Sequence, residues 1–85
     1  MIISVYGVKD LVVKQFLSPF HMRTHEEAIR AFKHEATTNV NSNFKQHPND
    51  FHLFHLGEFD SEHGVFIPLN TPPVLLARAS EFVDN

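Results

Sequence analysis

The chain has 85 residues, no cysteine and a formal net charge of -3 at pH 7. This length leaves room for one domain with a thin core, since a chain of this size buries only about 60 to 65% of its unfolded surface. The absence of cysteine excludes disulfides and thiolate metal sites and favours an intracellular protein. The apolar start MIISVYGV is far shorter than a membrane span of about 20 residues, so no membrane association is expected.

Charge is distributed unevenly along the chain. Residues 1 to 45 hold six Lys or Arg and four Asp or Glu, whereas residues 46 to 85 hold one Lys or Arg and six Asp or Glu. The first half therefore carries +2 and the second half -5, which predicts a modest basic face on an acidic protein. Protonation of all seven histidines would change the net charge from -3 to +4, so binding to an anion is expected to strengthen below about pH 6.5.

The first elements in chain order predict a β-hairpin. Residues 2–8 (IISVYGV) and 11–17 (LVVKQFL) are rich in β-branched and aromatic residues, and Lys9 and Asp10 between them predict a tight connection. Pro19 lacks an amide hydrogen and would end the second strand, so a loop is expected to follow.

Residues 24–40 predict the one main helix. Thr24 and Glu27 have the spacing of a capping box, in which a hydroxyl oxygen and a carboxylate satisfy amides of the first helical turn. The expected apolar stripe follows the helical spacing of three or four residues and consists of Ala28, Ile29, Phe32, Ala36 and Val40. The segment from Thr37 to Asp50 is rich in turn-forming residues and predicts the main loop.

A second hairpin is predicted from residues 51–60 (FHLFHLGEFD) and 65–69 (VFIPL), with Gly64 near the turn. A strand places alternate residues on opposite faces, so His52 and His55 should lie on opposite sides and cannot easily share a metal ion. Two prolines then introduce a tail that is expected to form a short amphipathic helical segment with Val74, Leu75, Leu76 and Phe82.

The predicted fold class is α+β. We expect an antiparallel sheet of about four strands in the order strand, strand, helix, strand, strand, with one main helix on one face and a short C-terminal helical segment. Residues 1–70 would form a single domain, and residues 71–85 would pack on it or on a partner subunit. One helix covers only one face of a sheet, so the other face should be buried by the tail, by a second subunit in a homodimer, or by a ligand such as nucleobases. A homodimer is the first expectation.

The motifs of enzymes and metal sites are not visible. The sequence contains no nucleophile elbow, glycine-rich phosphate loop or acidic dyad, and His25, Glu26 and Glu27 do not extend to an HExxH zinc motif. We therefore expect a protein that is not an enzyme, with no catalytic residue, no cofactor and no metal ion.

Four segments carry a resemblance to a known family: SVYGVKD (4–10), SPF (18–20), EEAIRAF (26–32) and HPNDFHLFHLGEFDSEHGVF (47–66). Through them, residues 3 to 69 resemble the small nonstructural DNA-binding protein of the gokushovirus branch of the microviruses, bacteriophages with circular single-stranded DNA genomes. Gly7 departs from the acidic residue expected there, and the tail beyond Leu69 matches no pattern. The resemblance implies binding of phage single-stranded DNA during genome replication or the switch to single-strand synthesis, in the host bacterial cytoplasm.

Binding of single strands without sequence preference combines Lys and Arg along the backbone with aromatic rings that stack on bases. The candidate phosphate contacts are Lys9, Lys14, Arg23, Arg30, Lys33 and Lys45, and the candidate stacking platforms are Tyr6, Phe16 and Phe44. The ordinary alternatives are a solvated surface charge for each basic residue and core or interface packing for each ring. The alternative function is a protein-interaction module that contacts phage or host replication proteins, or capsid proteins, with no direct DNA binding.

Overall fold

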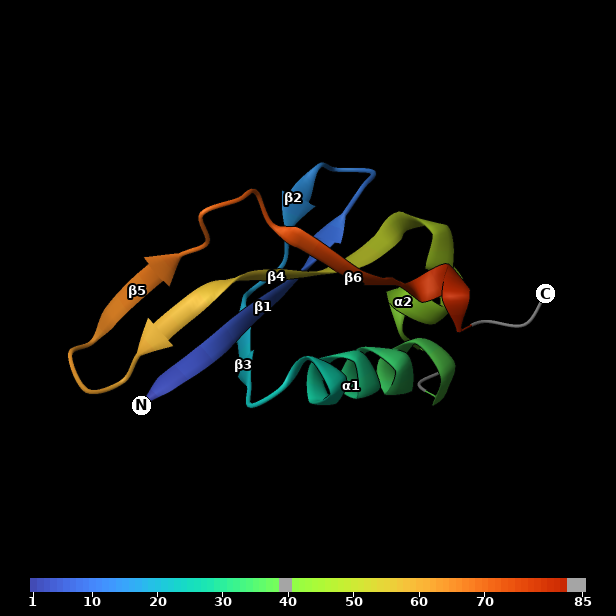
Figure 1. Cartoon of the computed structure of the whole chain (residues 1–85). Helices are drawn as coiled ribbons and strands as arrows, with labels where there is room; N and C mark the ends of the chain where they lie inside the picture. The colour runs from blue at the N-terminus through green and yellow to red at the C-terminus, as the bar shows by residue number, and fades with distance from the viewer. Residues whose placement is uncertain (39–40, 83–85) are drawn as a thin grey trace.

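A computed structural model of the chain describes residues 1–38 and 41–82. It contains an antiparallel sheet of six strands, a main helix α1 (His25–Thr38) and a short helix α2 (Asn43–Gln46). Figure 1 shows how these elements are arranged. The predicted α+β class is confirmed, but six strands replace the four expected. None of the described helices is long and apolar enough to cross a membrane.

Two long strands form the centre of the sheet. β1 (Ile2–Asp10) and β4 (Phe51–Asp60) pair antiparallel along their whole lengths. Short strands occupy the outer positions: β2 (Gln15–Phe16) and β3 (Phe20–Met22) pair with β1, and β5 (Val65–Pro68) and β6 (Val74–Arg78) pair with β4. Two short strands thus share each outer position of the sheet, which is why the sheet has six strands and not the four expected.

Prolines divide the outer strands. Pro19 separates β2 from β3, Pro68 ends β5, and Pro72 and Pro73 precede β6. A proline has no amide hydrogen for the ladder, so a strand stops or bends where it occurs. The loop expected after Pro19 is therefore wrong in part, because Phe20–Met22 returns to pair with β1 as β3.

The turn of the first hairpin lies later than the sequence predicts. β1 continues through Lys9 to Asp10, and the turn falls at residues 11–14, where a strand was expected. The cause is the Asp10 carboxylate, whose Oδ1 accepts hydrogen bonds from the amides of Val12 (3.0 Å) and Val13 (3.5 Å). Such side-chain to backbone bonds favour a turn over a continued ladder.

The main helix begins as predicted. The amide of Glu27 donates to Oγ1 of Thr24 at 3.1 Å, which confirms Thr24 as the N-cap. From the predicted apolar stripe, Ala28, Phe32 and Ala36 are buried and Ile29 is half-buried. Val40 lies outside the described residues.

The C-terminal tail differs from the prediction. Val74–Arg78 is not helical but forms β6, because the backbone hydrogen-bonding groups at the edge of β4 from His52 to His55 are available for pairing. The helical part of the tail is a single 3-10 turn, η2 (Ala79–Glu81). Ala77 and Ala79 are buried, and the Phe82 ring lies 6.4 Å from that of Phe32. The tail of this chain therefore packs on its own sheet and helix.

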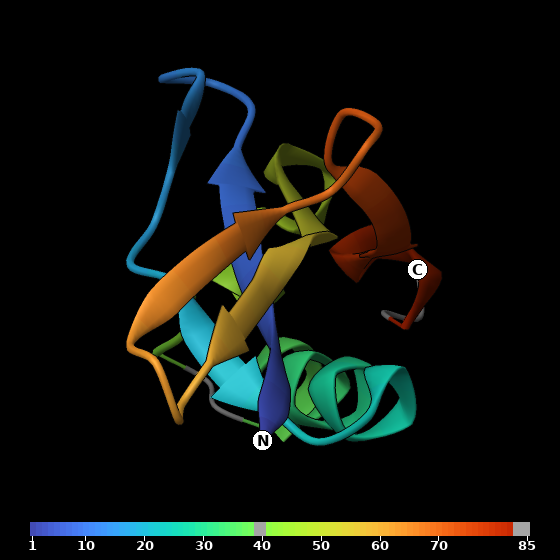
Figure 2. The same ribbon diagram turned by 60° about the vertical axis from the view of Figure 1, so that its left-hand side comes forward.

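The core lies between the sheet and α1. Its buried members are Tyr6, Val8, Ala28, Phe32, Ala36, Phe51, Leu53, Ala77 and Ala79. In the turned view, the β1–β2 turn and the loop between β5 and β6 extend away from α1 (Figure 2). The opposite face of the central strands is left without a covering helix from the described residues.

Candidate nucleic-acid interface

A row of basic and aromatic residues crosses the sheet on the face opposite α1. Phe16 of β2 pairs with Lys9 of β1, Lys9 with His52 of β4, and His52 with Arg78 of β6. Residues directly opposite one another in antiparallel strands point to the same face. Neighbouring strands are about 4.8 Å apart, so the row spans roughly 14 Å.

Two aromatic rings lie on this face. The rings of Phe16 and Phe54 contact edge to face, with their centroids 5.5 Å apart. Phe16 is 40% exposed and Phe54 is half-buried. Gly7 makes room for Leu56 and Phe16: a Cβ there would lie 2.7 Å from Leu56 Cδ1 and 3.4 Å from Phe16 Cδ1. The absence of a side chain at Gly7 therefore lets the Phe16 ring and the Leu56 side chain lie close to the backbone of β1.

Positive charge flanks the rings at two points. Lys9 Nζ lies 5.7 Å from the centroid of the Phe16 ring, a cation–π distance. The guanidinium of Arg78 is about half exposed and lies 3.8 Å from a carboxylate oxygen of Glu81, a weak surface pairing. Burial, with a contribution from Arg78, lowers the pKa of His52, so this histidine is neutral at pH 7. Lys9 and Arg78 are the permanent charges of the row.

The structure brings together three of the predicted site residues. Lys9 and Phe16 are paired in the row, and Lys14 is exposed in the turn that joins their strands. Tyr6 is fully buried against α1, so it cannot stack on a base without leaving the core. Phe44 is half-buried between Phe32 and Phe51, with centroid distances of 5.4 and 4.7 Å.

The other predicted residues lie away from the row. Arg23 precedes α1, and Arg30 and Lys33 are exposed on it. Lys33 Nζ lies 5.8 Å from the Phe82 ring, and Lys45 Nζ donates to the carbonyl oxygen of Thr37 at 3.2 Å. These four cations occupy the helix side of the molecule and do not extend the row.

Three residues of this sheet face were not predicted as site residues: His52, Phe54 and Arg78. Strand alternation groups His52 with Phe54, and that pattern is the signal that could have identified them. Arg78 had no such signal, because its segment was expected to be helical and its register with His52 is set by tertiary pairing.

The helix side of the sheet carries a separate cluster of polar rings. The Tyr6 hydroxyl lies 2.7 Å from Nδ1 of His25, and the His25 and His55 rings are 4.7 Å apart. His55 Nε2 is buried without a hydrogen-bond partner in the described part of the chain. Burial lowers the pKa of His55 and raises the pKa of Tyr6. His52 and His55 thus lie on opposite faces, as predicted. Among residues 1–38 and 41–82, no three His, Cys, Asp or Glu side chains are placed to hold a metal ion.

Comparison with known proteins identifies a family. A family model described as "Phage ORF5 protein" matches residues 3–82. The matched region extends beyond the predicted 1–70 domain and includes β6, which carries Arg78. No curated protein and no solved structure matches the chain.

Proposed function

The chain belongs to the phage ORF5 protein family, and from this membership we propose that it is a non-enzymatic bacteriophage protein that binds single-stranded DNA without sequence preference. The binding surface is the sheet face with Phe16, Phe54, Lys9 and Arg78. The resemblance to the microvirus DNA-binding protein supports DNA as the ligand, genome replication or the switch to single-strand synthesis as the stage, and the host bacterial cytoplasm as the place.

The exposed Phe16 ring, in contact with the half-buried Phe54 ring, carries the proposal. An open sheet face with aromatic side chains is one of the ways in which proteins hold unstacked bases, and each stack contributes about 1–3 kcal/mol. Phe16 on β2 offers an exposed ring, and the Phe54 ring on β4 contacts it edge to face across β1. Bases in a duplex are already stacked on one another, so this surface favours single strands. Every base has a π-face, so stacking is tolerant of sequence.

Lys9 lies beside Phe16 in the row and Arg78 lies two strands further along it, so a single strand with a base on Phe16 and its backbone along the row would meet both cations. Lys14, in the turn beside Phe16, adds a third cation. Three phosphate contacts on a single strand predict a slope of log K against log salt of about -2, since each contact contributes about -0.7. A fourfold rise in salt should then weaken binding about 16-fold. This modest dependence is consistent with a protein whose net charge is -3.

Fluorescence anisotropy tests the proposal. A labelled single strand of about 30 nucleotides and a duplex of the same sequence are titrated at two salt concentrations. We expect tighter binding to the single strand and a fall in affinity with salt of the size given above. Absence of binding at low salt, even near pH 6, would contradict the proposal and leave the protein-interaction module, which pull-down from infected cells would then address.

A further inference from the structure

A second pair of aromatic rings lies where β4 pairs with β5. Phe66 of β5 is 66% exposed, and its ring centroid is 4.9 Å from that of its half-buried cross-strand partner, Phe59 of β4. The arrangement repeats that of Phe16 and Phe54, in which an exposed ring on a short outer strand contacts a half-buried ring on β4. The sheet therefore carries two ring pairs of the same construction, one toward each outer edge.

The two ring pairs lie on the same face of the sheet. Phe54 is paired with Gly7 and Phe59 with Ile3, and these partners are four residues apart on β1, an even spacing that keeps them on one face. Phe54 and Phe59 themselves are five residues apart on β4. The odd residue is Leu56, which the pairing with β1 skips at a bulge. The bulge thus brings both ring pairs to the face opposite α1.

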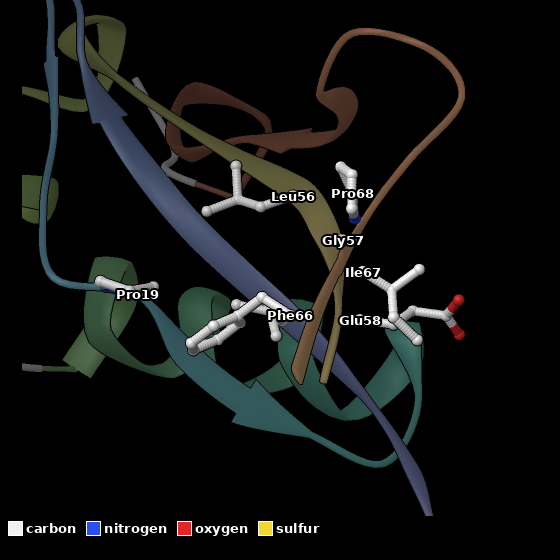
Figure 3. A pocket seen from close by; sticks show the side chains of 8 residues that line it. Pro19, Leu56, Gly57, Glu58, Phe66, Ile67 and Pro68 are labelled. Carbon is white, nitrogen blue, oxygen red and sulfur yellow. The ribbon is translucent and has the colours of Figure 1, made fainter. Parts of the chain in front are cut away.

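An apolar hollow lies beside the Phe66 ring. Its volume is about 280 Å³, and its lining includes the side chains of Val5, Pro19 and Leu56. Figure 3 shows the Phe66 ring and Pro19 on one side of β5, and the carboxylate of Glu58 on the other side, directed away from them. The hollow therefore offers the face of one ring and aliphatic walls, with the charge of Glu58 turned outward.

Leu56 makes the hollow continuous with the surface around Phe16, because both side chains lie over Gly7. The β1 residues in register with the two exposed rings are Lys9 and Ile3. They are six residues apart, or about 20 Å along the strand. At about 3.4 Å per nucleotide of a stacked strand, roughly six nucleotides cover this distance, which is within the range of known single-strand sites.

We infer that the hollow beside Phe66 is a second base-binding subsite, which holds a base of the same DNA single strand that stacks on Phe16. This inference rests on the proposed function and extends its surface along the sheet. A base inserted here stacks its apolar face on the Phe66 ring and keeps its polar edge in water, so the subsite does not discriminate between bases. The residues that line the hollow include no cation, so the subsite adds affinity without adding salt dependence.

Tryptophan fluorescence tests this inference directly. The chain has no tryptophan, so Phe66→Trp introduces a single reporter at the subsite, and a base that stacks on the indole ring quenches its emission. Val65→Trp is the matched control, because Val65 is 52% exposed on the same strand but lies on the opposite face from Phe66. Titration with an unlabelled single strand of about 30 nucleotides should quench Phe66→Trp with the Kd measured by anisotropy and leave Val65→Trp nearly unchanged.

Truncation of the ring gives a second readout. Phe66→Ala should weaken binding of the single strand about 5- to 150-fold at each salt concentration, with the slope of log K against log salt unchanged, whereas Val65→Ala should bind like the wild type. If the wild type binds the strand but Phe66→Trp is quenched no more than Val65→Trp, or Phe66→Ala keeps full affinity, the inference is overturned and the proposed function stands. If the wild type binds no single strand, both are overturned.

Discussion

The turn between β1 and β2 contains a backbone strain that a single substitution should relieve. Lys14 has a φ of 59°, in the left-handed region, and it occupies the same place in its turn as Gly64, with a φ of 69°, in the other hairpin. The two turns are built alike: Asp60 Oδ1 accepts from the amides of Glu62 (3.0 Å) and His63 (3.2 Å), as Asp10 Oδ1 does in the first turn. Lys14 therefore holds a conformation for which glycine is better suited.

Lys14→Gly should stabilise the protein by about 0.5–1 kcal/mol. The left-handed conformation costs a residue with a Cβ about 1–2 kcal/mol, and the substitution relieves this strain. The greater conformational freedom of glycine in the unfolded chain offsets about 0.5–1 kcal/mol of the stabilisation. For a domain of this size, the melting temperature should rise by about 2–8 °C. Urea unfolding followed by circular dichroism measures the difference directly.

Two variants control this experiment. Lys14→Ala removes the same charge but keeps the strain, so its stability should stay within about 0.5 kcal/mol of the wild type. Gly64→Ala should destabilise by about 1 kcal/mol, and through the backbone alone, since a Cβ at Gly64 would meet no atom within 4 Å. A Lys14→Gly variant no more stable than Lys14→Ala would refute the reasoning from φ.

Three further predictions follow from the packing, the buried histidines and the exposed ring. Gly57→Ala should destabilise by about 1–3 kcal/mol in urea unfolding, because the new Cβ would meet the backbone oxygen of Ile67 rather than a movable side chain, and an unchanged stability would contradict this contact. Burial lowers the pKa of His52 and of His55 in the folded protein, so below about pH 6.5 the unfolded chain binds more protons than the folded chain. The free energy of unfolding should therefore fall as the pH drops through that value, by up to about 1.4 kcal/mol per pH unit for each histidine. In unfolding measured from pH 7 to 5.5, His55→Gln should show a shallower loss, and an identical slope would exclude His55 as a source. Phe16→Leu should leave the fold intact and weaken binding of single-stranded DNA about 5- to 150-fold in anisotropy, whereas unchanged affinity would remove Phe16 from the site.

Local patterns in the sequence predict the central elements of the fold. The Thr24 cap and the spacing of Ala28, Phe32 and Ala36 predict α1, and the alternation in residues 51–60 predicts β4. These features depend on neighbours along the chain, and for that reason they could be predicted without a structure.

The outer strands depend instead on partners far away in sequence. Residues 74–78 have the apolar content of either a short helix or a strand, and the unfilled edge of β4 decides for the strand. In the same way, the Asp10 carboxylate moves the first turn beyond the position that composition predicts. Tertiary pairing and one side-chain hydrogen bond override local preference in these two places.

The candidate site was predicted only in part for the same reason. Charge and exposure can be estimated from the sequence, so Lys9, Lys14 and Phe16 were identified. The face on which a cation lies depends on register, and Arg78 joins the row only through the pairing of β6 with β4. Arg30 and Lys33 were equally plausible from composition but lie on the helix side.

The central claim is that the sheet face with Phe16, Lys9 and Arg78 binds single-stranded DNA. The most direct test compares two double charge reversals that change the net charge equally: Lys9→Glu with Arg78→Glu on the sheet face, and Arg30→Glu with Lys33→Glu on the helix side. Anisotropy with a labelled single strand should show binding lost in the first variant and largely kept in the second, with both folded by circular dichroism. Equal losses would indicate a response to net charge alone, and a loss confined to the second variant would place the DNA on α1; either result would contradict the account.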